Sequence, residues 1–144
     1  MNLLLDTSVQ PEYIFFTDRN LGKQFPNYLK KAGINVEKHS DHFEDNAKDE
    51  EWLTEIGKRG WYAITYDKRI RYKPNEKGAI KRFNVGLFVL FGKFPLHLQA
   101  INFIRTMPTI IKFINNNSRP FIAKIYRSHK ENKSGSVDMW ESFH

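Results

Sequence analysis

An apolar run that ends in a threonine and an acid occurs twice in this chain, and this pattern constrains the fold more than any other feature. Residues 61–67 read Trp-Tyr-Ala-Ile-Thr-Tyr-Asp, and residues 13–18 read Tyr-Ile-Phe-Phe-Thr-Asp. Short runs rich in β-branched and aromatic residues indicate buried strands. Because ligands of an open α/β sheet bind at the carboxyl ends of its strands, Asp18 and Asp67 are expected to face the crevice where chemistry takes place.

The rest of the chain alternates between strand and helix patterns. Apolar runs predict further strands at 34–38, 86–91 and 121–126. Apolar residues at helical spacing predict helices over about 20–33, 49–57, 75–83 and 95–115, the last divided in two at Pro108. Such alternation is typical of a mainly parallel sheet with helices on both faces, which is a three-layer α/β/α fold.

The chain is expected to form a single domain over residues 1–144, with its core at about 13–126. Residues 1–12 are expected to be an N-terminal extension, since a second strand candidate follows them directly. Residues 128–144 are polar and weakly patterned, which predicts a loosely held tail.

Charge and composition narrow the classes of function. The 23 Lys and Arg residues outnumber the 16 Asp and Glu residues, and the net charge of +7 favours a polyanionic partner such as nucleic acid. The absence of cysteine excludes disulfides and cysteine-based zinc sites. No stretch approaches the roughly 18 apolar residues of a membrane span, and no basic region opens a signal peptide. We therefore expect a cytoplasmic protein with no membrane association.

Three acids are candidates for a metal site. Asp18 and Asp67 follow strands and Asp49 begins a helix, so their carboxylates converge if the two strands are neighbours. Ionised carboxylates packed together repel one another unless a cation lies between them. Oxygen-only ligands favour Mg²⁺ or Mn²⁺. Such an ion can polarise a phosphodiester, lower the pKa of a bound water and position that water for attack.

A strongly basic segment follows Asp67. Residues 68–82 contain seven Lys and Arg residues against one acid, Glu76. The first four cations of this segment are expected to hold the phosphate backbone of a nucleic acid. These are Lys68, Arg69, Arg71 and Lys73.

Each of these features also has a purely structural explanation. Asp18 and Asp49 can serve as helix caps or first-turn acids, and the basic segment can be a solvated face. His39 and His42 suggest a transition-metal site only weakly, because no third nitrogen or sulfur ligand stands nearby in the sequence.

Several segments, taken in order, resemble the PIN-like domains of VapC-type toxins. They are residues 17–22 (Thr-Asp-Arg-Asn-Leu-Gly), 33–36 (Gly-Ile-Asn-Val), 49–53 (Asp-Glu-Glu-Trp-Leu) and 60–71, which ends in Thr-Tyr-Asp-Lys-Arg-Ile-Arg. The resemblance covers about residues 13–91. It implies a small α/β/α nuclease fold, metal-dependent RNA cleavage and a neighbouring antitoxin that would bind and silence the protein. Such domains often also pair as homodimers.

Carried over residue by residue, the resemblance makes Asp18, Asp49 and Asp67 the catalytic, metal-binding acids. PIN domains usually have a fourth acid two residues after the counterpart of Asp67, and this chain has Arg69 there. Glu76, in the next helix, is the candidate for a replacement ligand.

Three functions follow as hypotheses. The leading one is a Mg²⁺- or Mn²⁺-dependent ribonuclease of the toxin type. The alternative, suggested by Arg69, is a catalytically inactive PIN-like module that binds nucleic acid or a protein. The third is a signalling receiver, which also gathers acids at strand ends and needs a lysine after a later strand, where Lys93 is the candidate.

Overall fold

The computed structural model describes residues 13–130 and 133–144 and shows six strands and four α-helices in these ranges. The strands are β1 (Ile14–Thr17), β2 (Asn35–Lys38), β3 (Tyr62–Thr65), β4 (Gly86–Leu90), β5 (Phe121–Tyr126) and β6 (Ser136–Ser142). The helices are α1 (Gln24–Lys31), α2 (Asp49–Arg59), α3 (Pro74–Arg82) and α4 (Leu96–Asn116). Short 3₁₀ helices are η1 (Arg19–Leu21), η2 (His39–Asp41) and η3 (Lys68–Tyr72).

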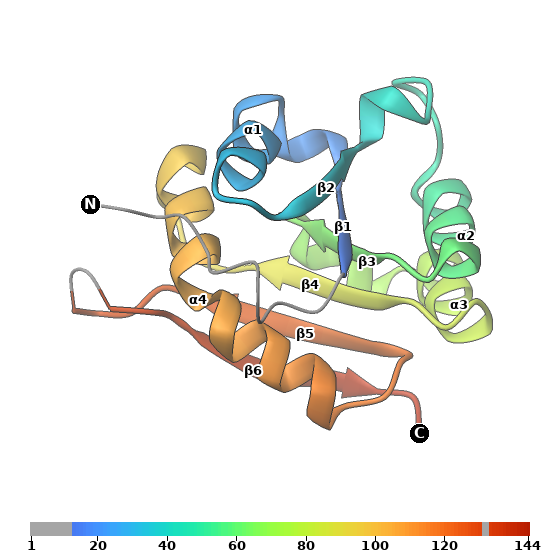
Figure 1. Ribbon diagram of the computed structural model, residues 1–144. Coiled ribbons are helices and arrows are strands. Elements are labelled where there is room, and N and C mark those ends of the chain that lie inside the picture. The colour runs from blue at the N-terminus through green and yellow to red at the C-terminus, as the bar shows by residue number, and fades with distance from the viewer. Residues whose placement is uncertain (1–12, 131–132) are drawn as a thin grey trace.

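The strands form one sheet in the order β2-β1-β3-β4-β5-β6 (Figure 1). The first five are parallel, and only β6 runs antiparallel to its neighbour β5. β1 and β3 are adjacent, with Phe16 opposite Ala63. The carboxyl ends of five strands therefore lie at one edge of the sheet, which we call the carboxyl edge.

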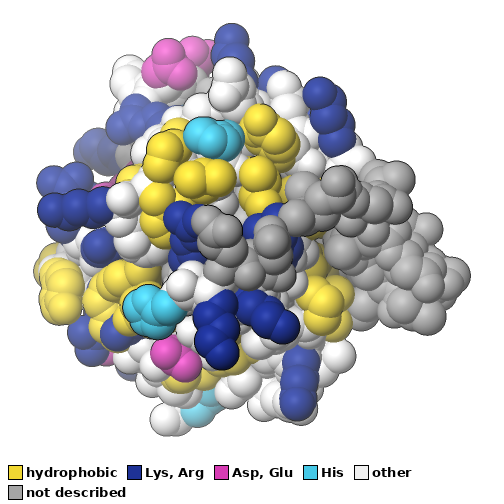
Figure 2. Space-filling view, turned by 90° about the vertical axis from the view of Figure 1, so that its left-hand side faces the viewer, with side chains coloured by type: hydrophobic (Ala, Val, Ile, Leu, Met, Phe, Trp, Pro, Cys, Tyr) yellow, Lys and Arg dark blue, Asp and Glu magenta, His cyan; other side chains and the backbone are white. Residues whose placement is uncertain are grey.

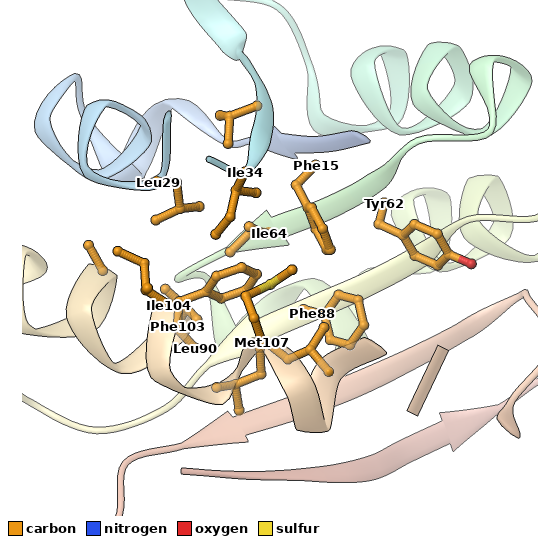
Figure 3. Packing of buried hydrophobic residues seen from close by; sticks show 14 of the residues in the cluster. Phe15, Leu29, Ile34, Tyr62, Ile64, Phe88, Leu90, Phe103, Ile104 and Met107 are labelled. Atoms are coloured by element: carbon orange, nitrogen blue, oxygen red, sulfur yellow. The ribbon is translucent and has the colours of Figure 1, made fainter. Parts of the chain in front are cut away.

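Helices cover both faces of the sheet, which confirms the predicted three-layer α/β/α architecture. On one face, α1 and α4 pack against residues such as Phe15, Ile64 and Phe88 (Figure 3). On the other, α2 and α3 pack against Phe16 and Leu87. Successive residues of one strand thus point into opposite cores, as the twofold periodicity of a strand requires. Burial on both faces explains why the parallel strands are continuously apolar.

Residues 96–116 form one uninterrupted helix, so the predicted division at Pro108 is wrong. Pro108 lies on the exposed side of α4, whereas Met107 and Ile110 are buried against the sheet. A proline removes one backbone hydrogen bond. Here, packing of the turns before and after it maintains the helix across the missing bond.

The C-terminal segment is not a loosely held tail as predicted, because Ser136–Ser142 form β6 on the edge of the sheet. Trp140 packs on Phe91, with ring centroids 5.0 Å apart, and the Glu141 carboxylate lies 2.8 Å from the Nζ of Lys77. No residue of β6 is fully buried, and the pairing shifts register between Ile122 and Ala123. Both properties weaken the alternating pattern by which a strand is recognised in a sequence.

Residues 1–12, predicted to be an extension, lie outside the described residues. In the described part of the chain, none of the helices has the length and apolar character needed to cross a membrane.

Candidate functional site

The structure brings Asp18, Asp49 and Asp67 together around one hollow of about 520 Å³. Asp18 follows β1, Asp67 follows β3, and Asp49 is the first residue of α2. Because β1 and β3 are adjacent and parallel, their ends meet at the carboxyl edge. We call this site the acid hollow. Its remaining lining is polar or cationic and consists of Arg19, Asn20, Tyr66, Lys68, Arg69 and Lys73.

Asp18 is the most deeply buried of the three acids, with 4% of its surface exposed. Its backbone N–H donates to the carbonyl of Ile64, which joins the end of β1 to β3. Its Oδ1 accepts the backbone N–H of Arg19 at 2.7 Å, and Asp18 thereby caps η1. Its Oδ2 accepts the hydroxyl of Thr65 at 2.8 Å. The carboxylate therefore caps a helix and also lines the hollow.

Thr65 is the polar hub of the site, and the sequence analysis assigned it no role there. Its Oγ1 donates to Asp18 and accepts the backbone N–H of Asp67 at 3.1 Å and the side-chain amide of Asn20 at 3.3 Å. The Asn20 carbonyl oxygen accepts the backbone N–H of Tyr66. The signal in the sequence is the Thr-X-Asp spacing, since a threonine hydroxyl commonly bonds a backbone group two residues on.

Asp67 and Asp49 share one cation, the ammonium group of Lys73. Its Nζ lies 3.2 Å from Oδ2 of Asp67 and 3.7 Å from Oδ2 of Asp49. The other oxygen of each acid is anchored locally. Oδ1 of Asp67 accepts both the backbone N–H and the Nε–H of Arg69, and Oδ1 of Asp49 accepts the indole N–H of the buried Trp52.

The surroundings shift the pKa values of Asp18 and Asp67 in opposite directions. Burial raises the pKa of Asp18 from 3.8 to about 6, the Thr65 hydrogen bond opposes this shift, and the nearby charge of Asp49 adds to it. Burial also raises the pKa of Asp67, but hydrogen bonds from Arg69 and Lys73 outweigh burial and leave the pKa below its ordinary value. The hollow therefore combines a carboxyl that holds its proton at mildly acid pH with a carboxylate that stays ionised.

The donors suit a hard divalent cation by their chemistry, because all three are carboxylates. Within residues 13–130 and 133–144, no group of three His, Asp or Glu side chains is placed so that it could hold a metal ion. Lys73 instead supplies the positive charge between Asp49 and Asp67. A divalent ion shared by the three acids has to take the place of that ammonium group.

The other candidate residues lie in different surroundings. Lys68 lines the acid hollow and stacks over the ring of Phe91 at 4.8 Å. Arg71 turns toward β6, where it stacks on Trp140 at 5.1 Å and lies 3.9 Å from Glu141. Of the described residues that line the acid hollow, none is Glu76 or Lys93, so neither the replacement ligand nor the receiver lysine is placed there.

The two histidines do not come together as a metal site. The His39 ring is buried between the rings of Phe16 and Phe43, and burial lowers its pKa. His42 instead pairs with Glu37 at 3.2 Å. His39 is thus a core residue of the loop after β2.

Comparison with known proteins agrees with this arrangement of a parallel sheet and carboxylates at its edge. A family described as PIN like domain matches residues 13–92, from β1 to just beyond β4. The match spans more than half of the chain, and the protein therefore belongs to the PIN-like domain family. No curated protein matches, and no solved structure matches. The α4, β5 and β6 segments lie beyond the matched region.

Proposed function

We propose that the protein is a metal-dependent ribonuclease that cleaves RNA phosphodiester bonds at the acid hollow. The observation that carries the proposal is the meeting of Asp18, Asp49 and Asp67 around one cavity whose rim is cationic. Family membership agrees with it, since nuclease activity is frequent among PIN-like domains. The toxin role, with an antitoxin partner, rests on the resemblance of the sequence alone and remains part of the proposal.

For the three acids to hold Mg²⁺ or Mn²⁺, their side chains would have to move closer together than they are in this structure, and the ion would have to replace Lys73. A bound ion would polarise the phosphodiester and lower the pKa of a water molecule. The chain's own residues orient the site. Thr65 fixes Asp18 and the backbone of Asp67, and Trp52 fixes Asp49.

The cations around the acids would bind the phosphate backbone of the substrate. Lys68 and Arg69 line the hollow, and the Arg69 side chain is 81% exposed although its Nε bonds Asp67. Lys73, displaced from the acids, is free to contact a phosphate. Arg71 is held by Trp140 and Glu141. We therefore assign Arg71 the role of attaching η3 to β6 and not that of binding RNA.

A second candidate function is a module that binds nucleic acid without cleaving it. It is favoured by Lys73 and Arg69, which already satisfy the charge of Asp67 from within the chain. A protein whose acids are neutralised by its own cations could bind RNA through the same rim with no divalent ion.

Cleavage of a labelled RNA by purified protein distinguishes the two functions. We expect cleavage with Mg²⁺ or Mn²⁺, no cleavage in EDTA, and none with Asp67→Asn, which retains an oxygen to accept the Arg69 backbone N–H. The matched control is Asp138→Asn on β6, which removes an exposed acid that does not line the hollow. RNA left intact under all conditions, but bound equally with and without the ion, would establish the binding module.

A further inference from the structure

A second hollow, of about 280 Å³, lies beside the first half of α4 and is strongly basic. Four cations line it, namely Arg105 from α4, Arg127 directly after β5, and Lys130 and Lys133 from the loop before β6. We call it the basic hollow. Within the described part of the chain, no acid lines it, and residues 127–133 carry three Lys and Arg against the single acid Glu131.

The two hollows share the carboxyl edge of the sheet. The acid hollow lies at the ends of β1 and β3, and Arg127 follows the end of β5, which is parallel to both. Adjacent strands are about 4.8 Å apart, so the three strand spacings from β1 to β5 amount to roughly 14 Å. The basic hollow is thus within reach of an extended strand that occupies the acid hollow.

The loop between β4 and α4 connects the walls of the two hollows. The carbonyl of Gly92 accepts the hydroxyl of Tyr66, which lines the acid hollow, at 2.7 Å. It also accepts the side-chain amide of Gln99, in the first turns of α4, at 3.0 Å. In the same loop, the ring of Phe94 lies 5.0 Å from the guanidinium of Arg127. These contacts fix the position of one hollow relative to the other.

We propose that the basic hollow is a second phosphate-binding site that holds the same single-stranded RNA whose scissile bond lies at the acid hollow. This inference rests on the proposed function and extends it by defining the length of the substrate. All four cations lie outside the segment that matches the family, residues 13–92. The basic hollow is therefore a property of the α4, β5 and β6 region of this chain.

A nucleic acid strand suits this surface because the strand carries its negative charges along a backbone and the surface carries its cations in two separate hollows. β3 and β4 point to the left of Figure 1, so Figure 2 looks onto the edge where they end. Lys and Arg side chains are spread over that face, with hydrophobic side chains between them. Release of condensed counterions by successive phosphates favours binding to such separated cations. Partly exposed rings near the path, such as Phe94, can in addition support bases.

The test compares RNA lengths in a double variant, Arg127→Ala with Lys130→Ala. Fluorescence anisotropy in EDTA measures binding of labelled 2′-O-methyl oligonucleotides of about 3 and about 12 nucleotides, since sites of this kind cover roughly 4 to 16 nucleotides. We expect the double variant to bind the longer probe about tenfold more weakly than the wild type does. The slope of its binding affinity against salt concentration should correspond to about one to two fewer neutralised phosphates. Both proteins should bind the shorter probe with the same affinity.

The matched control is Lys31→Ala with Lys112→Ala, which removes the same charge. Both lysines are exposed and lie in the last turns of helices that lead to the opposite edge of the sheet. The inference would be overturned if the double variant and this control bound the longer probe with equal affinity. It would also be overturned if the double substitution weakened binding of polyglutamate more than binding of RNA. These outcomes do not depend on cleavage. Wild-type protein that leaves RNA intact but shows the expected loss in the double variant overturns the ribonuclease proposal alone.

Discussion

The buried carboxyl of Asp18 should destabilise the metal-free protein at neutral pH. Burial raises its pKa from 3.8 to about 6, and only 4% of the residue is exposed. In the unfolded chain the carboxyl titrates near its ordinary value, so unfolding releases a proton between these two pH values. The contribution of Asp18 to stability is therefore greatest below about pH 4, falls as the pH rises to about 6, and is constant above it.

The size of this effect follows from the pKa difference. A shift of about 2 units, from 3.8 to about 6, corresponds to about 3 kcal/mol of unfolding free energy. Asp18→Asn removes the titration while keeping the shape and the acceptor for the Arg19 backbone N–H. Relative to the protonated carboxyl, the amide makes a hydrogen bond with Thr65 that is weaker by about 1 kcal/mol at every pH. We therefore expect the variant to be about 2 kcal/mol more stable than the wild type at neutral pH.

This prediction is tested by measuring the unfolding free energy of both proteins with urea, in EDTA and at a series of pH values. The difference in unfolding free energy between Asp18→Asn and the wild type should grow by about 3 kcal/mol between about pH 3 and about pH 7. All other carboxyl groups are common to both proteins, and those that do not interact with Asp18 cancel in the difference. The control Asp138→Asn, at an exposed position of β6, should show no such trend. A difference that stays constant, or that decreases as the pH rises, would refute the reasoning.

Two further predictions test the ion pair in the acid hollow and the C-terminal strand. Lys73→Met should raise the affinity for Mn²⁺ about tenfold, equivalent to about 1.4 kcal/mol, because the ion no longer competes with an ammonium group for Asp49 and Asp67. Titration calorimetry measures the Mn²⁺ affinity, with Lys81→Met as the control. An affinity of Lys73→Met equal to that of the wild type would contradict the prediction. Trp140→Ala should lower stability in urea by about 2 to 3 kcal/mol through lost contacts with Phe91, whereas a loss below about 0.5 kcal/mol would show that β6 is not firmly packed.

Much of the core could be predicted from the sequence because each parallel strand is buried on both faces. The runs around Phe16, Ile64 and Phe88 are apolar without interruption, and each ends where a polar residue or a turn begins. The acids at the strand ends were recognisable for the same reason. Asp18 and Asp67 mark the points where buried chain meets the solvent-facing edge.

The contacts between the acids and their neighbours could not be predicted in this way. Lys73 was assigned to a phosphate, but η3 turns the chain so that its ammonium group reaches two carboxylates. Arg71 was given the same role, yet it lies against Trp140 of a strand that the sequence did not predict. Both outcomes depend on which residues distant in the sequence become neighbours, and no local pattern records this.

The sequence by itself determined the five parallel strands, the positions of the helices and those of the three acids, because apolar periodicity reflects how each segment is buried. Only the tertiary structure decided that β1 and β3 are neighbours, that Lys73 lies between Asp49 and Asp67, and that a second cationic hollow shares their edge. These depend on the lateral order of the strands and on the docking of β6. Long-range packing sets both, and it brings together charges that lie far apart along the chain.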